Sequence, residues 1–252
     1  MEGTIKVEIQ GKAGIITFFH PASNSFPSHQ LAKLEQEINK LALNKDITVI
    51  GLQSEGEKAF CAGASFDELL SISNKEEGKK FFSGFANVIN AMRKAPQIIV
   101  GKAQGKAVGG GVGLLAACDY VIASEVASIK LSEIAIGIGP FVIEPAVSKK
   151  IGTTAMSSLT LNPSAWQTSS WAKEKGLYQQ VYTTLEETNN AFKAYIEKTS
   201  EYNPLALLEI KKIIWQNCDK WDSLLAERAA ISGDLVLSEF TKKALTAFRK
   251  KD

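Results

Sequence analysis

The stretch that decides the fold runs from Gly105 to Asp119 and reads GKAVGGGVGLLAACD. It follows Ile98-Ile99-Val100, a short apolar run rich in β-branched residues, which is typical of a buried strand. Consecutive glycines indicate that another group approaches the backbone closely, and the apolar residues after them favour a helix. The stretch therefore predicts a strand, a glycine turn and a helix.

The start of this helix is suited to negative charge, because its first N–H groups have no partner within the helix and its dipole is positive there. Two nucleotide-binding motifs do not fit. The dinucleotide pattern, counted from Gly109, requires glycine where the chain has Leu114, and the phosphate-loop pattern requires Gly-Lys-Ser or Gly-Lys-Thr where Gly110 is followed by Gly111. We therefore expect this turn to stabilise a carbonyl oxygen that becomes negative during a reaction.

A second loop of the same kind lies upstream. Residues 60–69 read FCAGASFDEL and follow 49–52, another apolar strand candidate. Two such loops placed side by side could each donate one N–H group to the same oxygen, which is the arrangement of an oxyanion hole.

These two motifs, in this order, resemble the crotonase superfamily, the enoyl-coenzyme A hydratases and isomerases. The resemblance covers roughly residues 5 to 252. It implies an α/β fold in which ββα units repeat as a spiral, with residues 1–195 forming the core that holds the acyl-coenzyme A site. Residues 196–252 would form a C-terminal helical region that packs in a homotrimer or a dimer of trimers. The alternation of strands and helices by itself favours an α/β fold with parallel strands.

The resemblance also implies the site residues. The N–H groups of Ala64 and Gly110 would form the oxyanion hole, and Glu133 would be the catalytic base. The residues implied in substrate binding are Ser25, Ala62, Gly63, Ser65, Phe66, Gly109 and Pro140. Ser65 stands where relatives commonly carry aspartate, a departure that we expect to be mild. Coenzyme A would enter as part of the substrate, and we expect no prosthetic group and no metal, because no histidine, carboxylate or cysteine cluster has ligand spacing.

The residues around Glu133 give an independent reason to consider it. It precedes the largely apolar segment 134–141, and burial there would raise the pKa of its carboxyl toward the value that a general base needs near neutral pH. From the residues alone, a solvent-facing glutamate at a turn is an equally good interpretation. Glu144 is a rival carboxylate, although its position before Pro145 suits the start of a helix.

Which reaction the sequence predicts depends on a second position in the chain. By resemblance, hydratases of the superfamily use two glutamates, one of which lies three residues after the middle glycine of the triplet, where this chain has Gly113. Moving a double bond from the 3- to the 2-position of an enoyl thioester requires one base, so the pattern is most similar to that of Δ3,Δ2-enoyl-coenzyme A isomerases of fatty acid metabolism. The alternatives are hydration, another crotonase reaction such as decarboxylation, and a non-catalytic acyl-coenzyme A-binding scaffold.

Composition and the absence of certain motifs argue against several other classes of protein. The chain has 252 residues, 45% of them hydrophobic, and a formal net charge of +2, which gives no signal for a nucleic-acid partner. Its three cysteines show no pairing pattern, which favours a reducing compartment. We found no apolar run of membrane-spanning length, and we expect a cytoplasmic protein without a membrane partner. The absence of a Gly-x-Ser-x-Gly motif argues against a serine hydrolase.

Several structural roles also follow from the sequence. Segments 5–9 and 14–19 predict a β-hairpin, and Ser28 is expected to cap a helix with an apolar face at Leu31, Leu34, Ile38 and Leu41. The apolar stripe between Phe81 and Met92 predicts a core helix. Cys118 is expected to be a buried structural thiol, and Asp119 a structural hydrogen-bonding residue.

Overall fold

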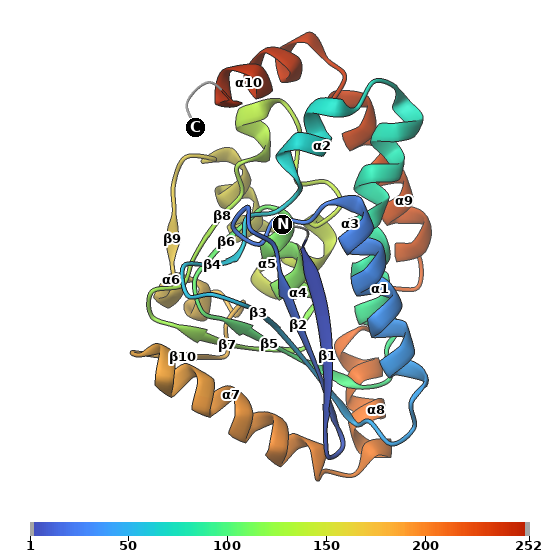
Figure 1. Cartoon of the computed structure of the whole chain (residues 1–252), viewed down its shortest axis with the longest axis vertical. Helices are drawn as coiled ribbons and strands as arrows, with labels where there is room; N and C mark the ends of the chain where they lie inside the picture. The colour runs from blue at the N-terminus through green and yellow to red at the C-terminus, as the bar shows by residue number, and fades with distance from the viewer. Residues whose placement is uncertain (1–2, 250–252) are drawn as a thin grey trace.

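The computed structural model describes residues 3–249 and contains two β-sheets (Figure 1). The larger sheet has the strand order β1-β2-β3-β5-β7-β10, and the smaller has the order β4-β6-β8-β9. The strands of the larger sheet are β1 (Thr4–Gln10), β2 (Ala13–Phe19), β3 (Val49–Ser54), β5 (Ile98–Ala103), β7 (Tyr120–Ser124) and β10 (Gln180–Tyr182). Those of the smaller sheet are β4 (Ala59–Cys61), β6 (Lys106–Val108), β8 (Ser128–Lys130) and β9 (Gln167–Thr168).

The chain winds through both sheets repeatedly. Strands β3, β5 and β7 run parallel in the larger sheet, and each is followed by a strand of the smaller sheet, β4, β6 and β8, which also run parallel. Each strand pair then leads into a helical segment. These segments are α2 (Phe66–Ser71) and α3 (Lys75–Lys94), α4 (Gly110–Ala117), and η1 (Glu133–Ile136) with α5 (Glu144–Leu161). This arrangement confirms the predicted α/β spiral of ββα units.

The N-terminal prediction of a hairpin is confirmed, because β1 pairs antiparallel with β2 from Thr4 opposite Phe19 to Gln10 opposite Ala13. The cap predicted for the next helix, α1 (Ser28–Leu43), is wrong. Ser28 is already the first helical residue and Pro27 is the N-cap, so the serine is placed too late to cap the helix. Its backbone N–H and its Oγ instead donate to Oε2 of Glu68, at 2.9 and 2.6 Å.

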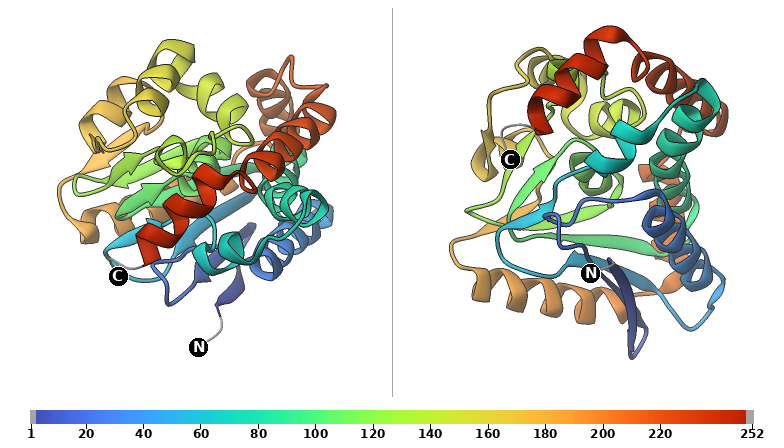
Figure 2. Two further views of the ribbon diagram at one scale, coloured as in Figure 1. Left: turned by 90° about the horizontal axis from the view of Figure 1, so that it is seen from above. Right: turned by 45° about the horizontal axis from the view of Figure 1, so that its top comes forward.

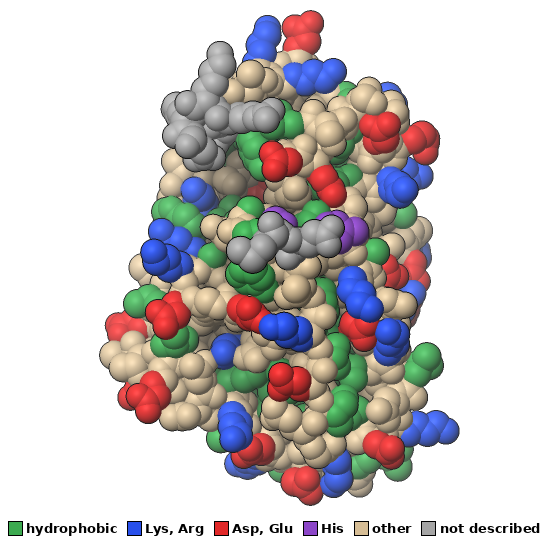
Figure 3. Space-filling model, in the orientation of Figure 1, with side chains coloured by type: hydrophobic (Ala, Val, Ile, Leu, Met, Phe, Trp, Pro, Cys, Tyr) green, Lys and Arg blue, Asp and Glu red, His purple; other side chains and the backbone are tan. Residues whose placement is uncertain are grey.

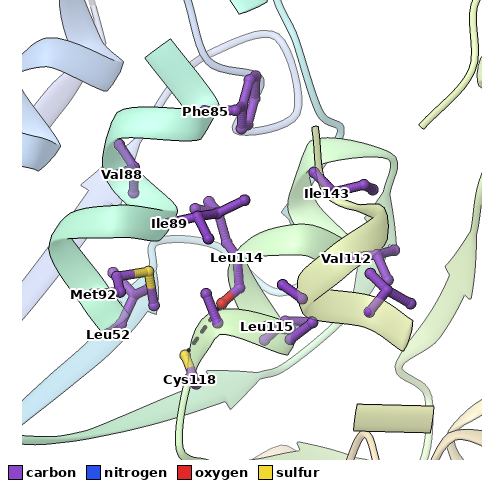
Figure 4. Close-up of a cluster of buried hydrophobic side chains, with 14 of the residues drawn as sticks. Leu52, Phe85, Val88, Ile89, Met92, Val112, Leu114, Leu115, Cys118 and Ile143 are labelled. Atoms are coloured by element: carbon purple, nitrogen blue, oxygen red, sulfur yellow. Dashed lines mark hydrogen bonds between the residues drawn. The ribbon is translucent and has the colours of Figure 1, made fainter. Parts of the chain in front are cut away.

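Helices cover both faces of the larger sheet. Helix α7 (Leu185–Ser200) runs along one face, where Phe192 and Ile196 pack on Val49 and Val100 (Figure 1). On the other face lies the main core, shared with α1, α3 and α4. Figure 4 shows the packing of residues from α3 (Phe85, Val88, Ile89, Met92) with residues from α4 (Val112, Leu114, Leu115). The core position predicted for Cys118 is confirmed: it is fully buried, which raises the pKa of its thiol to about 12.

The C-terminal part of the described chain is helical. Its remaining helices are α6 (Ser169–Glu174), α8 (Pro204–Ile214), α9 (Trp221–Leu235) and α10 (Glu239–Arg249). Helix α9 packs closely on α3, because a Cβ atom on Gly78 would lie 2.7 Å from the carbonyl oxygen of Gly233. Helix α10 lies against η1 and α2 (Figure 2). The predicted division of the chain at residues 195 and 196 lies within α7 and stays a prediction.

Asp119 joins the C-terminal helices to the sheet. Its Oδ2 accepts hydrogen bonds from the backbone N–H of Ile99 on β5, at 2.7 Å, and from Nζ of Lys211 on α8, at 2.6 Å. Its Oδ1 accepts from Nε1 of Trp215, at 2.7 Å. The structural hydrogen-bonding role predicted for Asp119 is confirmed.

The surface carries charges of both signs. In the view of Figure 3, basic and acidic side chains are interspersed, in keeping with a formal net charge of only +2. Among residues 3–249, no helix combines the length and the apolar character that crossing a membrane requires.

Candidate active site

A cavity of about 540 Å³ lies where the loops after β4 and β6 meet η1 and the start of α5. All ten residues predicted for the site line it. They are Ser25, Ala62, Gly63, Ala64, Ser65, Phe66, Gly109, Gly110, Glu133 and Pro140. Residues from four separate segments of the sequence therefore meet in one place.

The two glycine-containing loops touch each other through their backbones. Gly63 has a φ of +91°, and a Cβ atom there would lie 2.9 Å from the carbonyl oxygen of Val108 and 3.5 Å from the nitrogen of Gly110. A Cβ atom on Gly111 would lie 2.5 Å from the carbonyl oxygen of Cys61. Only glycine permits this approach, because any side chain would force the loops apart.

Two backbone N–H groups at this contact are free. The neighbouring groups are used: Gly109 donates to the carbonyl of Lys130 at 3.0 Å, and Ser65 donates to the carbonyl of Phe26 at 2.9 Å. Within residues 3–249, the N–H groups of Ala64 and Gly110 have no acceptor, and both residues line the cavity. Gly110 is also the first residue of α4, where the helix dipole favours negative charge. The loops thus offer two donors to an oxygen atom of a ligand.

Glu133 directs its carboxylate into this cavity. The η1 turn that carries it is partly exposed, but Oε2 is buried and has no hydrogen-bond partner among the described residues. Gly109 is adjacent, because a Cβ atom there would lie 2.7 Å from Oε1 of Glu133. Burial raises the pKa of Glu133 to about 7, while the N–H groups of Ser132 and Glu133 oppose this shift to a smaller extent. The alternative of a solvent-facing carboxylate is therefore wrong.

Neither the rival carboxylate Glu144 nor the nearby Asp67 is buried in the cavity. Glu144 begins α5, as its position before Pro145 predicted, and its Oε1 accepts a hydrogen bond from Oγ of Ser148 at 2.6 Å. It does not line the cavity. Asp67 lines the cavity but is exposed on α2. Among the described lining residues, Glu133 is thus the one buried carboxylate.

The position of Gly113 is covered by an apolar side chain. A Cβ atom on Gly113 would collide with Ile143, whose own Cβ would be 2.7 Å away. Ile143 is buried and lines the cavity. The place where a second acidic side chain would enter is therefore filled with hydrocarbon.

Sequence reasoning missed part of the apolar wall. Phe82 and Phe85 belong to the stripe predicted as core, and both also line the cavity. The ring of Phe85 lies against Gly110, so it closes one side of the site. Periodicity could not reveal this, because the face of α3 that packs in the core is continuous with the face that borders the cavity.

The polar residues near the cavity have local roles. Ser65 is the N-cap of α2, where its Oγ accepts a hydrogen bond from the N–H of Glu68 at 3.4 Å. Serine and aspartate are both good caps, which explains physically how serine fits at this position. His20, which sequence reasoning did not assign to the site, also lines the cavity. Burial lowers the pKa of His20, and its Nδ1 accepts from the N–H of Ala22 at 3.2 Å.

Known proteins share this sequence pattern and fold. A sequence model of the enoyl-CoA hydratase/isomerase family matches residues 8–251. The short-chain-enoyl-CoA hydratase of Clostridium acetobutylicum is 28% identical over 249 residues, which cover 97% of this chain and 94% of that protein. The ethylmalonyl-CoA decarboxylase of Xenopus tropicalis is 31% identical over 120 residues, covering 46% of this chain and 39% of that protein.

The fold is likewise shared with solved structures. The crystal structure of enoyl-CoA hydratase from Bacillus halodurans superposes with a TM-score of 0.88 at 24% identity, covering 96% of this chain and 99% of that one. The family match over nearly the whole chain and the shared fold agree with the paired loops described above. The chain belongs to the enoyl-CoA hydratase/isomerase family.

Proposed function

We propose that the protein is an enoyl-CoA isomerase that moves a double bond from the 3- to the 2-position of an acyl thioester. The observation that carries this proposal is a single buried carboxylate, Glu133, in a cavity where the apolar side chains of Phe82, Phe85 and Ile143 also form part of the wall. Shifting a double bond by two proton transfers needs one group that first accepts and then returns a proton. A carboxyl with a pKa of about 7 is suited to both steps near neutral pH.

The reaction would begin when the thioester oxygen accepts hydrogen bonds from the N–H groups of Ala64 and Gly110. Glu133 would then remove a proton from C2, giving a dienolate whose negative charge is concentrated on that oxygen. The protonated Glu133 would return the proton at C4, which leaves the double bond between C2 and C3. Removal of one donor from such an oxyanion hole typically costs ~10²–10³ in rate.

Substrate binding would use the remaining residues of the cavity wall. Ser25, Ala62, Gly63, Ser65, Phe66, Gly109 and Pro140 are proposed to contact the thioester and the adjoining part of coenzyme A. The apolar side chains of Phe82, Phe85 and Ile143 would hold the hydrocarbon next to Glu133, and they would exclude water from the dienolate.

The environment of Gly113 supports isomerisation over hydration. Addition of water across a double bond uses two carboxylates to hold the water and move its protons. Here the position of the second one has no side chain, and Ile143 fills the space above it. Water held by hydrocarbon on that side would lack the polar partners that it needs.

The test compares 3-enoyl and 2-enoyl thioesters of several chain lengths with the purified protein. We expect conversion of the 3-enoyl to the 2-enoyl compound and little addition of water. Glu133→Gln should abolish most of this conversion while thioester binding persists, and Glu144→Gln serves as the matched control that should keep it. Full activity of Glu133→Gln would refute the proposal.

Hydration is the second candidate, because the relative from Clostridium acetobutylicum that matches nearly the whole chain is named a short-chain-enoyl-CoA hydratase. In the same assay it predicts formation of a 3-hydroxyacyl product from the 2-enoyl thioester. Decarboxylation predicts loss of carbon dioxide from a 2-carboxyacyl thioester. Binding of all thioesters without turnover would identify a scaffold.

We also propose that the chain assembles as a trimer through its C-terminal helices. On α8, Leu205 and Ile213 are 71% and 64% exposed, and Ile210 is 48% exposed. Apolar side chains grouped on one helix favour burial against another surface. Light scattering coupled to size-exclusion chromatography tests this, and Leu205→Asp together with Ile213→Asp should yield monomers.

A further inference from the structure

A second cavity, of about 690 Å³, lies between the larger sheet and α7. It shares no lining residue with the cavity that contains Glu133. Its walls come from the turn between β1 and β2, from β3 and β5, and from α7, which runs beneath the sheet in Figure 1. The reaction proposed above makes no use of it.

Lys102 of β5 projects into this cavity and is half-buried. Its Nζ donates a hydrogen bond to Oδ1 of Asn189 on α7, at 2.7 Å, and lies 5.7 Å from the centre of the Phe192 ring. Within the described part of the chain, no carboxylate forms an ion pair with it. The amine is therefore held by a neutral acceptor beside an aromatic ring.

The two other lysines of the cavity differ from Lys102. Lys12 is 52% exposed and pairs with Glu201 at 3.2 Å, and Lys193 is 70% exposed and pairs with Glu197 at 3.9 Å. These four side chains are the other charged groups that face the cavity from the hairpin turn, from α7 and from the residue after it. They form two exposed pairs of opposite charge, whereas Lys102 has no carboxylate partner within residues 3–249.

The protonation state of Lys102 follows from this placement. Burial lowers its pKa to about 8, because the charged ammonium loses hydration that Asn189 replaces only in part. Neutral lysine amines are nucleophiles, and desolvation in a pocket is one of the ways in which proteins activate them.

We propose that Lys102 is a site of covalent acylation by acyl thioesters, the class of compound on which enzymes of this family act. The lone pair of Nζ attacks the thioester carbonyl carbon, a C–N bond forms, and the C–S bond breaks. The thiolate leaves and takes up the proton that the nitrogen loses, so the products are an amide and a free thiol. No other reactant is required.

The cavity suits the product as well as the nucleophile. An amide nitrogen keeps one N–H group, which can still donate to Oδ1 of Asn189. The acyl chain would lie beside Phe192 and Ile196, two apolar residues of the wall. Acylation of Lys102 is independent of the reaction at Glu133 and should proceed equally in Glu133→Gln.

The experiment incubates the purified protein with acetyl-CoA at pH 8 and follows each lysine by quantitative peptide mass spectrometry. At this pH about half of Lys102 would be neutral, against roughly 0.4% of a lysine with the ordinary pKa of about 10.4. A weaker base is also a weaker nucleophile, which offsets part of this ratio. We expect Lys102 to react at least about tenfold faster than Lys12 and Lys193 in the same molecules.

A matched variant separates reactivity from simple access. Asn189→Asp keeps the shape of the cavity but places a carboxylate beside the amine, which should raise the pKa of Lys102 and slow its acylation about tenfold or more.

In the unmodified protein, the rate of acylation at Lys102 should level off above pH 8, while the rates at Lys12 and Lys193 continue to rise. Lys102→Arg, checked by circular dichroism, identifies the modified peptide. Equal rates at the three lysines, or an unchanged rate in Asn189→Asp, would overturn the inference.

Discussion

Glu133 and Asp119 are two carboxylates held inside the same protein, at opposite ends of α4. Asp119 follows the C-terminal end of the helix and accepts hydrogen bonds from three donors, one of them the buried ammonium of Lys211. Glu133 packs against Gly109 at the N-terminal end, and its Oε2 has no donor among the described residues. Oε2 of Glu133 is buried, as is the side chain of Asp119, and the difference lies in their hydrogen-bond partners.

The comparison shows that hydrogen-bond partners distinguish a carboxylate that stabilises the fold from one that can transfer a proton. A carboxylate whose oxygens both accept hydrogen bonds links the elements that supply its donors. A buried carboxylate without such donors is destabilised in its charged form, and its pKa rises into the range where proton transfer is easy. The next four predictions test this contrast, in order of decreasing expected effect.

The largest effect is expected from Glu133→Gln on turnover. Removal of a positioned general base typically costs 10²–10⁴-fold, so the rate of the proposed isomerisation should fall by about that factor. Circular dichroism should show an intact fold, since the amide has nearly the shape of the carboxyl. The measurement is kcat with a saturating 3-enoyl thioester, and a loss smaller than tenfold would contradict the assignment.

The second effect is expected from Asp119→Ala on stability. The substitution leaves the ammonium of Lys211 and the N–H groups of Ile99 and Trp215 buried without acceptors, and breaking such a pair costs about 3–5 kcal/mol. Denaturant unfolding measures this loss. The remaining folded protein should keep its turnover number, because Asp119 does not line the catalytic cavity; a selective loss of turnover in fully folded protein would break the comparison.

A smaller effect of opposite sign is expected for Glu133→Gln on stability. The folded-state pKa of about 7 exceeds the ordinary value of about 4.3, so the folded protein binds more protons between these values and its stability falls as pH rises through them. Glutamine does not ionise. The variant should therefore be more stable than the unmodified chain by roughly 1–3 kcal/mol at pH 8, with the difference vanishing near pH 4. Unfolding curves at the two pH values test this, and a variant destabilised at pH 8 would argue against an uncompensated charge.

The smallest effect concerns the pH profile of turnover. Because the proposed reaction needs ionised Glu133, its rate should fall about tenfold for each pH unit below an apparent pKa near 7. Binding of a non-reactive thioester serves as the control and should stay nearly constant over the same range. A turnover rate that stays constant down to pH 5 would instead mean that the catalytic carboxylate is hydrated and its pKa is not raised.

Particular residues show what could be predicted and what could not. The glycine turn at Gly109 and Gly110 and the alternation of strands and helices were predictable, because glycine runs and apolar periodicity are local properties. Ser28 shows where local signals fail: a cap depends on the residue at which the helix begins, and Pro27 placed that start one residue early. The roles of Phe85 and Ile143 in the cavity depend on helix packing, which periodicity does not describe.

By itself, the sequence determined the order of strands, turns and helices and the loops in which backbone N–H groups are left free, since these follow from neighbouring residues. Only the tertiary structure decided that Oε2 of Glu133 is buried without a hydrogen-bond partner among the described residues and that Ile143 covers Gly113. It also decided that Lys102, within residues 3–249, bonds to Asn189 and pairs with no carboxylate. The pKa of a side chain depends on water and charges brought to it by segments far away in the chain. The reactivity of Glu133 and Lys102 therefore depends on the tertiary structure, whereas the strands, turns and helices follow from the local sequence.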